Sequence, residues 1–417
     1  MKTKILMIII LLSIGTVKNL NAQFSGGFGT EIEPYLIQNI GDLQELHDSI
    51  MSSPVFPANN NWSKGKYFIL MNDITDSLRE PIGFGTISGP VHMRTQLYPF
   101  QGNFDGNNYK ITLAINNHMA NGIQPECGLF SMISNAKISN LTVDGYIIYN
   151  TNPNFARIGS IVGWARDTFE ILNCTSYVNI NAVHIVGGIV AFCYYSTGKI
   201  ENCVNYGNLS TSSSVGGIAL SLASVSGVHE ILNCKNFGKL IGASVGGIVN
   251  SSEGSHIISN CENHGELLST GVAGGIAASA MGAKILNCGN YNNVTGNIAG
   301  GIAGNVFRAT SVSDCINLSN IGGISGVGGI IGMISFDNSS IQPSVTDNTN
   351  YGFVKGDSNV GGIMGGINNI SGATVTNNFN SGVVVGTSNV GCIVGSKGTG
   401  TNNISNNHYD KQMCGEE

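Results

Sequence analysis

The sequence predicts an all-β fold: a right-handed parallel β-helix of about nine coils, with a strand and a helix capping its N-terminal end. Three observations support this. Glycine accounts for 58 of the 417 residues, and 42% of the chain is hydrophobic while only 11% is charged. An Asn-Cys pair recurs at nearly constant spacing, and a cluster of two glycines and an aliphatic residue recurs between the pairs. Glycine allows tight turns and aliphatic side chains form a core, so the combination is typical of a β-solenoid.

The spacing of the Asn-Cys pairs defines the coil. The pair occurs as Asn173-Cys174, Asn202-Cys203, Asn233-Cys234, Asn260-Cys261 and Asn287-Cys288, with Asp314-Cys315 as a sixth copy. Successive cysteines lie 29, 31, 27, 27 and 27 residues apart. One coil cannot bury its own inner face, so coils with this period are expected to stack at a strand spacing of ~4.8 Å and share a continuous core.

Each repeat has three pieces, which predict three short strands and a triangular coil. The first is a glycine-aliphatic cluster such as Val186-Gly187-Gly188-Ile189. The second is an aliphatic residue followed by Asn-Cys, and the third is a segment such as Asn205–Leu209, in which Gly207 marks a turn.

Side-chain alternation predicts a corner at the asparagine of each Asn-Cys pair. The residue three before each cysteine is always Ile or Val and should point inward, whereas the residue after the cysteine varies and should point outward. Both conditions hold if the chain turns at the asparagine, a residue that tolerates the left-handed conformation. The cysteines should then stack inside the coils.

The N-terminus predicts export. Lys2 and Lys4 precede the apolar stretch 5–17, and cleavage is expected near Ala22 or Gln23, so residues 1–23 are predicted to be a signal peptide. No later stretch is long and apolar enough to span a membrane. We therefore expect a secreted or cell-surface protein of bacterial type.

The rest of the chain divides into three predicted segments. Residues 24–110 form a cap with lead-in strands, residues 111–405 form the repeat array, and residues 406–417 form a C-terminal tail. Within the cap, Pro34–Ile37 predicts a strand, and Asp42–Ile50 predicts an amphipathic helix. Such a cap is needed because an open solenoid end exposes core and strand edges.

Charge and motifs argue against several functions. The net charge of −6 does not favour nucleic-acid binding, which needs a basic face. The sequence contains no HExxH or Walker motif, and we predict no cofactor, no metal and no catalytic residue. A β-helical enzyme would need aligned carboxylates, yet five acidic residues share no repeat position: Asp167, Glu201, Glu230, Glu253 and Glu262.

The candidate site residues are the six repeat cysteines and the five asparagines before them. Stacked thiols in an exported protein could form disulfides, bind metal or act in redox chemistry. One thiol per coil makes a column, however, whereas zinc needs a tetrahedral cluster. We predict a structural ladder of buried, inert thiols beside a ladder of corner asparagines.

Two further columns of polar residues are predicted. The asparagine two residues after the cysteines from Cys203 to Cys315 either binds sugars or bonds backbone groups at the turn, and we expect the second. His229 and His256, each five residues before a cysteine, should stack on neighbouring coils as surface residues. Two histidines without further ligands do not predict a metal site.

The repeats resemble the GLUG-motif family of bacterial secreted and cell-surface proteins. The resemblance rests on Gly301-Ile302-Ala303-Gly304, Gly329-Ile330-Ile331-Gly332 and Gly362-Ile363-Met364-Gly365, together with the Asn-Cys and aromatic-Gly pieces. In this chain Ile replaces the family's usual Leu, and the closing glycine is absent at Ala191, Leu220, Asn250 and Ala278. The resemblance implies an adhesin-like β-helix whose repeats are not catalytic.

We therefore expect a monomeric binding, adhesion or scaffold module that contacts a glycan or a protein at the cell surface, with no nucleic-acid partner. The outer face of the Gly-Gly-Ile strand, poor in large and charged side chains, is the predicted docking surface. Two alternatives remain open: a β-helical polysaccharide lyase or glycoside hydrolase, and a truncated stalk of a larger surface protein.

Overall fold

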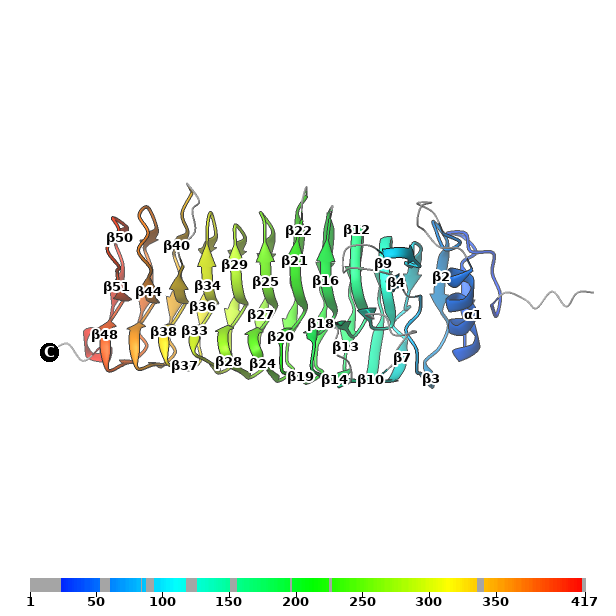
Figure 1. Ribbon diagram of the computed structural model, residues 1–417, viewed down its shortest axis with the longest axis horizontal. Coiled ribbons are helices and arrows are strands. Elements are labelled where there is room, and N and C mark those ends of the chain that lie inside the picture. The colour runs from blue at the N-terminus through cyan, green and yellow to red at the C-terminus, as the bar shows by residue number, and fades with distance from the viewer. Residues whose placement is uncertain are drawn as a thin grey trace, which may run out of the picture.

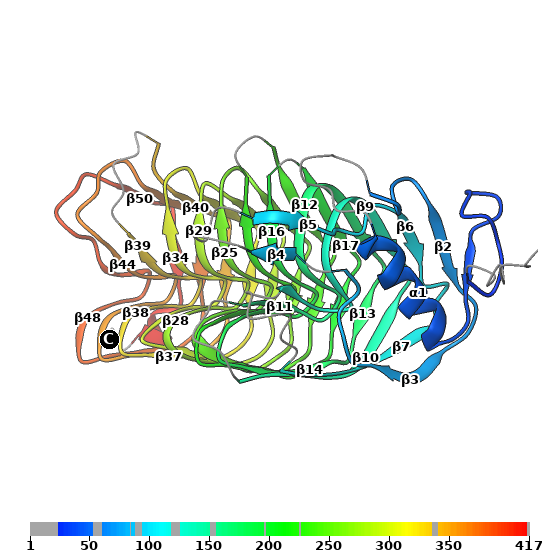
Figure 2. The same cartoon turned by 45° about the vertical axis from the view of Figure 1, so that its right-hand side comes forward.

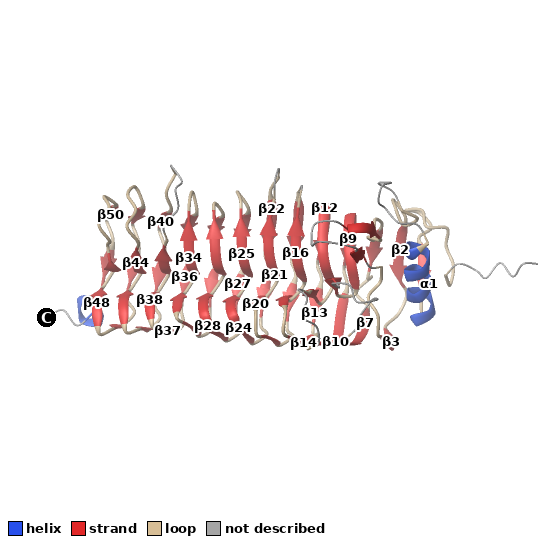
Figure 3. Ribbon diagram, viewed as in Figure 1, coloured by secondary structure: helices blue, strands red, loops and turns tan. Residues whose placement is uncertain are grey.

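The computed structural model describes residues 24–52, 61–83, 85–87, 94–117, 126–150, 156–195, 197–224, 227–335 and 341–414. It confirms the predicted parallel β-helix, an elongated stack of about 11 turns with very little helix (Figures 1 and 3). The predicted signal peptide, residues 1–23, lies outside the described residues.

The stacking begins before the recognisable repeats, so the estimate of about nine coils was too low. Strands β1 (Tyr35–Ile37), β2 (Tyr67–Leu70) and β6 (Asn103–Asp105) pair in parallel and in register, and β6 pairs with β9 (Phe130–Ser139). On the other sheet, β3 (Ile74–Leu78) pairs with β7 (Lys110–Asn116). The segment predicted as lead-in strands thus supplies coils of its own, although it lacks the Asn-Cys pair.

The N-terminal end of the stack is covered by helix α1 (Ile40–Met51) (Figure 2). The helix begins with a capping box, in which the Asn39 side chain accepts from the Asp42 N–H and the Asp42 side chain accepts from the Asn39 N–H. Leu43, Leu46 and Ile50 are fully buried against the first coils. These apolar side chains cover core that would otherwise face solvent.

A typical coil contains five short strands rather than the three predicted. One coil runs through β16 (Val190–Tyr194), β17 (Gly198–Glu201), β18 (Val204–Asn205), β19 (Leu209–Thr211) and β20 (Ser214–Gly216). The first two belong to a 21-stranded parallel sheet and the other three to a 28-stranded one. The prediction was wrong because turns inside each piece of the repeat divide it into shorter strands.

The Gly-Gly pairs form a tight bend between the two sheets, where β15 (Ile185–Gly187) leads into β16. A Cβ atom on Gly188 would lie 1.9 Å from the Gly217 carbonyl oxygen, and one on Gly217 would lie 2.0 Å from the Gly247 carbonyl oxygen. Only glycine fits at so close a backbone approach.

This bend corrects the predicted docking surface, because the Gly-Gly-Ile segment is buried rather than exposed. The strand before the bend and the strand after it approach each other with their outer faces. Asn250, at the position of the missing closing glycine, donates to the Ser244 hydroxyl at 2.9 Å. A Cβ atom on Gly304 would lie 2.5 Å from a Val272 methyl group. The closing glycine therefore belongs to a packed inner corner and offers no surface to a partner.

The last strand pairing involves β46 (Phe379–Asn380) and β51 (His408–Tyr409), so part of the predicted tail still belongs to a coil. A short 3₁₀ helix, Lys411–Cys414, follows it. In the part of the chain that the structure describes, no helix is long and apolar enough to cross a membrane.

Candidate functional site

The six repeat cysteines form one column inside the coils. Each is at most 2% exposed, and none is bonded to another as a disulfide. Their thiols donate to backbone carbonyls, as Cys234 does to Leu232 at 3.2 Å and to Ile200 at 3.6 Å. Burial raises the pKa of the Cys234 thiol well above its ordinary value. A buried, protonated thiol is a poor nucleophile and metal ligand.

Among the described residues, no group of three or more His, Cys, Asp or Glu side chains is arranged to hold an ion. The thiols instead behave as small apolar groups that fill a narrow interior.

The asparagines before the cysteines form the coil corner. The backbone φ of these five residues lies between 53° and 56°, which is the left-handed region: Asn173, Asn202, Asn233, Asn260 and Asn287. Their side chains lie outside, where the Asn202 amide donates to Asn173 at 3.0 Å and the Asn173 amide to Asn140 at 3.1 Å. The corner turns the following cysteine into the core.

A second asparagine ladder lies two residues after the cysteines, and it is fully buried. Asn236 shows the pattern: its amide N–H donates to the Gly238 carbonyl at 3.0 Å and to the Asn263 side chain at 2.9 Å. These amides satisfy backbone groups at the turn and bond one another from coil to coil. Because they are buried, they offer nothing to a sugar.

His229 and His256 stack as predicted, with ring centroids 4.9 Å apart, but they are not surface residues. They are 1% and 0% exposed. His256 Nδ1 accepts from the His229 backbone N–H at 3.0 Å, and its Nε2 lies 2.9 Å from the Glu253 carbonyl oxygen, so the ring is neutral with its proton on Nε2. Burial lowers the pKa of both histidines, and that of His256 falls to about 4 with a further contribution from His229.

The prediction that His229 lies on the surface failed because the preceding coil has a glycine, with no side chain, at the aligned position. In the preceding coil Gly198 occupies the position of His229, and the Phe169 ring lies over that glycine. The space left by the missing side chain allows the Phe169 and His229 rings to approach to 5.7 Å. The absence of a side chain at Gly198 thus lets the rings from the coils on either side contact each other.

Sequence reasoning missed a column of outward side chains, six hydrophobic and one histidine, which we name the ridge. It comprises the residue three after the cysteine position in seven successive coils: Tyr177, Tyr206, Phe237, His264, Tyr291, Leu318 and Tyr351. The His264 side chain is 29% exposed and the others are between 39% and 51% exposed. The signal was present as the residue before the turn glycine in segments such as Asn205–Leu209, where only the glycine was interpreted.

The rings of the ridge are stacked in parallel. From Tyr177 to Tyr291, successive centroids lie 4.6 to 4.9 Å apart with interplanar angles of 5° to 12°. These distances match the spacing of neighbouring strands, ~4.8 Å. Each inner ring covers the faces of its neighbours, so the ridge presents ring edges and tyrosine hydroxyls to solvent. The three inner rings, Tyr206, Phe237 and His264, are each held on both sides, which restricts their motion.

Charged residues flank the middle of the ridge. Glu262 accepts from the His264 ring at 2.8 Å and from the Lys235 ammonium at 2.9 Å, while Lys239 and Glu266 pair at 2.7 Å on the other side. Hydrogen bonds from His264 and Lys235 lower the pKa of Glu262 despite its partial burial. The ridge is therefore an apolar strip with a neutralised polar border.

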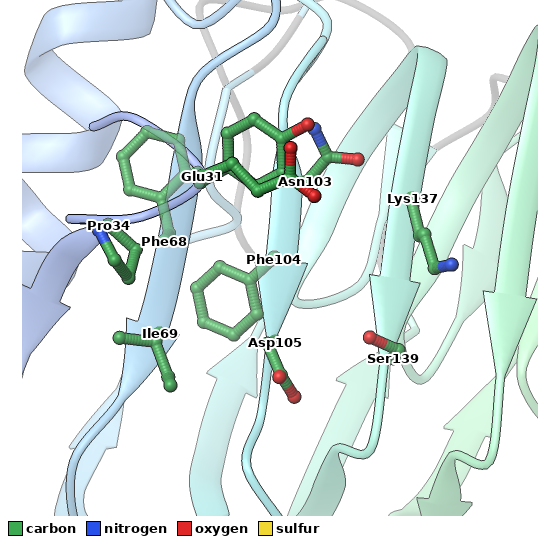
Figure 4. A pocket seen from close by; sticks show the side chains of 10 residues that line it. Glu31, Pro34, Phe68, Ile69, Asn103, Phe104, Asp105, Lys137 and Ser139 are labelled. Carbon is green, nitrogen blue, oxygen red and sulfur yellow. The ribbon is translucent and has the colours of Figure 1, made fainter.

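A hollow of about 430 Å³ lies at the N-terminal end, on the outer side of β2, β6 and β9 (Figure 4). Glu31, Asp105 and Lys137 are its charged lining residues. In the view of Figure 4, Phe104 lies between the side chains of Glu31 and Asp105. Asp105 Oδ1 accepts from the Asn107 N–H at 2.9 Å and from the Asn140 amide at 3.0 Å, so this carboxylate holds a turn in place.

A column of alternating charge continues along the same sheet. In successive coils Lys137 aligns with Glu170, Glu170 with Lys199, and Lys199 with Glu230. The Lys137–Glu170 pair is 3.2 Å apart and both side chains are nearly half exposed. The acidic residues compared in the sequence are indeed unaligned, and the aligned carboxylates Glu170 and Glu230 are separated by a lysine. This pattern is that of solvated ion pairs between coils.

Comparisons with known proteins leave the family open. No family model matches the chain, and no curated protein matches it. Among solved structures, the chain is similar to a crystal structure of a Bacteroides ovatus protein described as a candidate immunoglobulin A1 protease. The two share 18% identity with a TM-score of 0.47, and the match covers 77% of this chain and 85% of that one. So distant a likeness carries no argument about activity.

Proposed function

We propose that this chain is an exported β-helical module of bacterial surface or secreted type, related to the GLUG-motif repeats, which binds a partner and performs no catalysis of its own. The observation that carries the proposal is the ridge, a column of seven outward side chains of which all but His264 are large hydrophobic residues. Contiguous exposed apolar surface with a polar border is typical of an interaction site. Because the rings support one another, binding would cost little side-chain entropy.

The geometry of the ridge favours an extended partner that lies along the solenoid axis. Sugars stack on ring faces, and in the ridge the inner faces are covered by neighbouring rings. Ring edges and hydroxyl groups in a straight row instead suit a protein surface or an extended chain, which can contact several coils at once. Adhesion to a cell-surface or matrix protein is the form of binding that fits best.

The test exposes the mature protein to immobilised polysaccharides, mucins and matrix proteins, and records both retention and new reducing ends. Tyr206→Ser together with Phe237→Ser should abolish retention while leaving the fold intact, because both side chains point outward. The matched control is Ile241→Ser, which removes a side chain of similar exposure (40%) away from the ridge. Retention that survives the ridge variant, or new reducing ends from the purified chain, would contradict the proposal.

A further inference from the structure

A second outer surface lies on the 21-stranded sheet, around strand β12 (Val162–Leu172). Trp164 and Arg166 both point outward from this strand, and the Arg166 guanidinium lies 4.9 Å from the centre of the Trp164 ring and 5.1 Å from that of Tyr195. Arg157 approaches the same Trp164 ring to 5.3 Å from the neighbouring bend. Two guanidinium groups therefore lie within 5.3 Å of the centre of the indole ring.

The two arginines differ in how their charge is balanced. Arg157 donates to Glu126, a carboxylate only 2% exposed, at 2.8 Å. Arg166 forms no ion pair among the described residues, and its Nε is buried without a hydrogen-bond partner. The adjacent carboxylate of Asp167 is engaged by the Ser134 hydroxyl at 2.7 Å. The buried Nε cannot reach a ligand, but the terminal N–H groups are not buried, and the guanidinium has no anionic partner among the described residues.

The surroundings of Arg166 supply a ring platform beside this charge. Trp164 packs with Met132 and Leu97 into a small apolar cluster outside the coils, and Phe192 and Tyr194 join its edge. Tyr195 next to them is 39% exposed. Unlike the ridge, these rings are tilted against one another, with Tyr194 and Tyr195 at 62°, so they are not stacked face to face.

We propose that this surface binds a sugar that carries a carboxylate. The guanidinium of Arg166 would take the carboxylate through paired N–H donors, and the exposed tyrosine ring would contact the sugar ring. The site is separate from the ridge, which lies beside the other sheet, so either proposal can fail while the other holds.

The chain contains two tryptophans, which makes a direct assay feasible. In a Trp62→Phe background, Trp164 is the only indole and reports on its own surroundings. Trigalacturonate should change its fluorescence in a saturable way, whereas the fully methyl-esterified trimer, which keeps the ring and loses the charge, should not. Inorganic sulfate serves as a probe for a simple anion site.

Arg166→Gln should raise the dissociation constant for trigalacturonate by about tenfold or more, and Arg166→Lys should restore only part of the affinity because lysine lacks the planar fork. Lys355→Gln, an exposed substitution on the other sheet and outside the ridge, is the control and should not change the affinity for trigalacturonate. Circular dichroism establishes that each variant is folded. Binding should also weaken as salt rises.

Three results would overturn the proposal: equal binding of the methyl ester, unchanged affinity in a folded Arg166→Gln variant, or sulfate binding as tight as that of the sugar. The last would identify a simple anion site instead. If Arg166→Gln fails to fold, the comparison of acid and ester on the Trp62→Phe chain still decides the question.

Discussion

Acid should destabilise the middle coils through the stacked histidines. In the folded chain His256 is neutral and fully buried, and its pKa is lowered from 6.5 to about 4 by burial and by the neighbouring His229. The unfolded chain binds a proton near pH 6.5, whereas the folded chain resists it until about pH 4. The contribution to stability is therefore complete above pH 6.5 and is lost as the pH falls toward 4.

The size of the effect follows from the two pKa values. One pKa unit corresponds to about 1.4 kcal/mol, so the shift of His256 represents about 3 kcal/mol of unfolding free energy. Burial lowers the pKa of His229 as well, which acts in the same direction. A loss of this size is a large fraction of the stability of an ordinary domain.

The assay is urea unfolding followed by circular dichroism at several pH values between about 7.5 and 4. His256→Gln keeps a neutral polar side chain near the Glu253 carbonyl and should flatten the pH dependence by about 3 kcal/mol relative to the natural chain. His408→Gln, an exposed substitution in the last coil, should leave the pH dependence as it is. If His256→Gln loses stability with acid as steeply as the natural chain, the histidine stack is not the cause.

Three other substitutions or treatments test the core. Asn263→Ala should cost about 2–3 kcal/mol in urea unfolding, because it removes hydrogen bonds to the buried amides of Asn236 and Asn290 in the neighbouring coils and to the Gly265 backbone in its own coil. Cys234 should resist a thiol reagent in the native protein and react only on unfolding, as peptide mass spectrometry would show; labelling at the native rate of an exposed thiol would contradict its burial. Gly217→Ala should prevent folding or lower the melting temperature strongly, since its Cβ would lie 2.0 Å from the Gly247 carbonyl oxygen, whereas Gly322→Ala, with its nearest neighbour 3.9 Å away, should be tolerated.

The inward half of each repeat could be predicted from sequence because packing constrains it. The interior admits only small or aliphatic side chains, so the recurrence of Ile171 and Cys174 at the same positions of successive repeats reveals that both point inward. The left-handed corner at Asn173 was predictable for a similar reason, since few residues tolerate that conformation. The second asparagine ladder was predictable because polar backbone groups at a turn need hydrogen-bond partners.

The failures arose where the structure depends on contacts between coils. His229 is buried because Gly198 in the preceding coil leaves room for a ring, which no single repeat reveals. The Gly-Gly pair was predicted to form an exposed strand face with few side chains, yet it forms a bend whose backbone packs against the next coil. Both errors came from judging a position within its own repeat, when its environment is set by the same position one coil away.

The difference between inward and outward positions determines where a functional site can lie on this fold. Inward positions are nearly identical from coil to coil because the core demands it, and they offer no freedom for recognition. Outward positions are free to vary. Ring stacking between coils favours the ridge from Tyr177 to Tyr291, and a binding role would explain why large apolar side chains continue beyond the stack at Leu318 and Tyr351. Arg166, in contrast, occurs in a single coil. Tyr194 and Ala223 occupy the aligned positions of the next two coils. A continuous column suits a partner that spans many coils, and a unique residue suits a ligand that touches one.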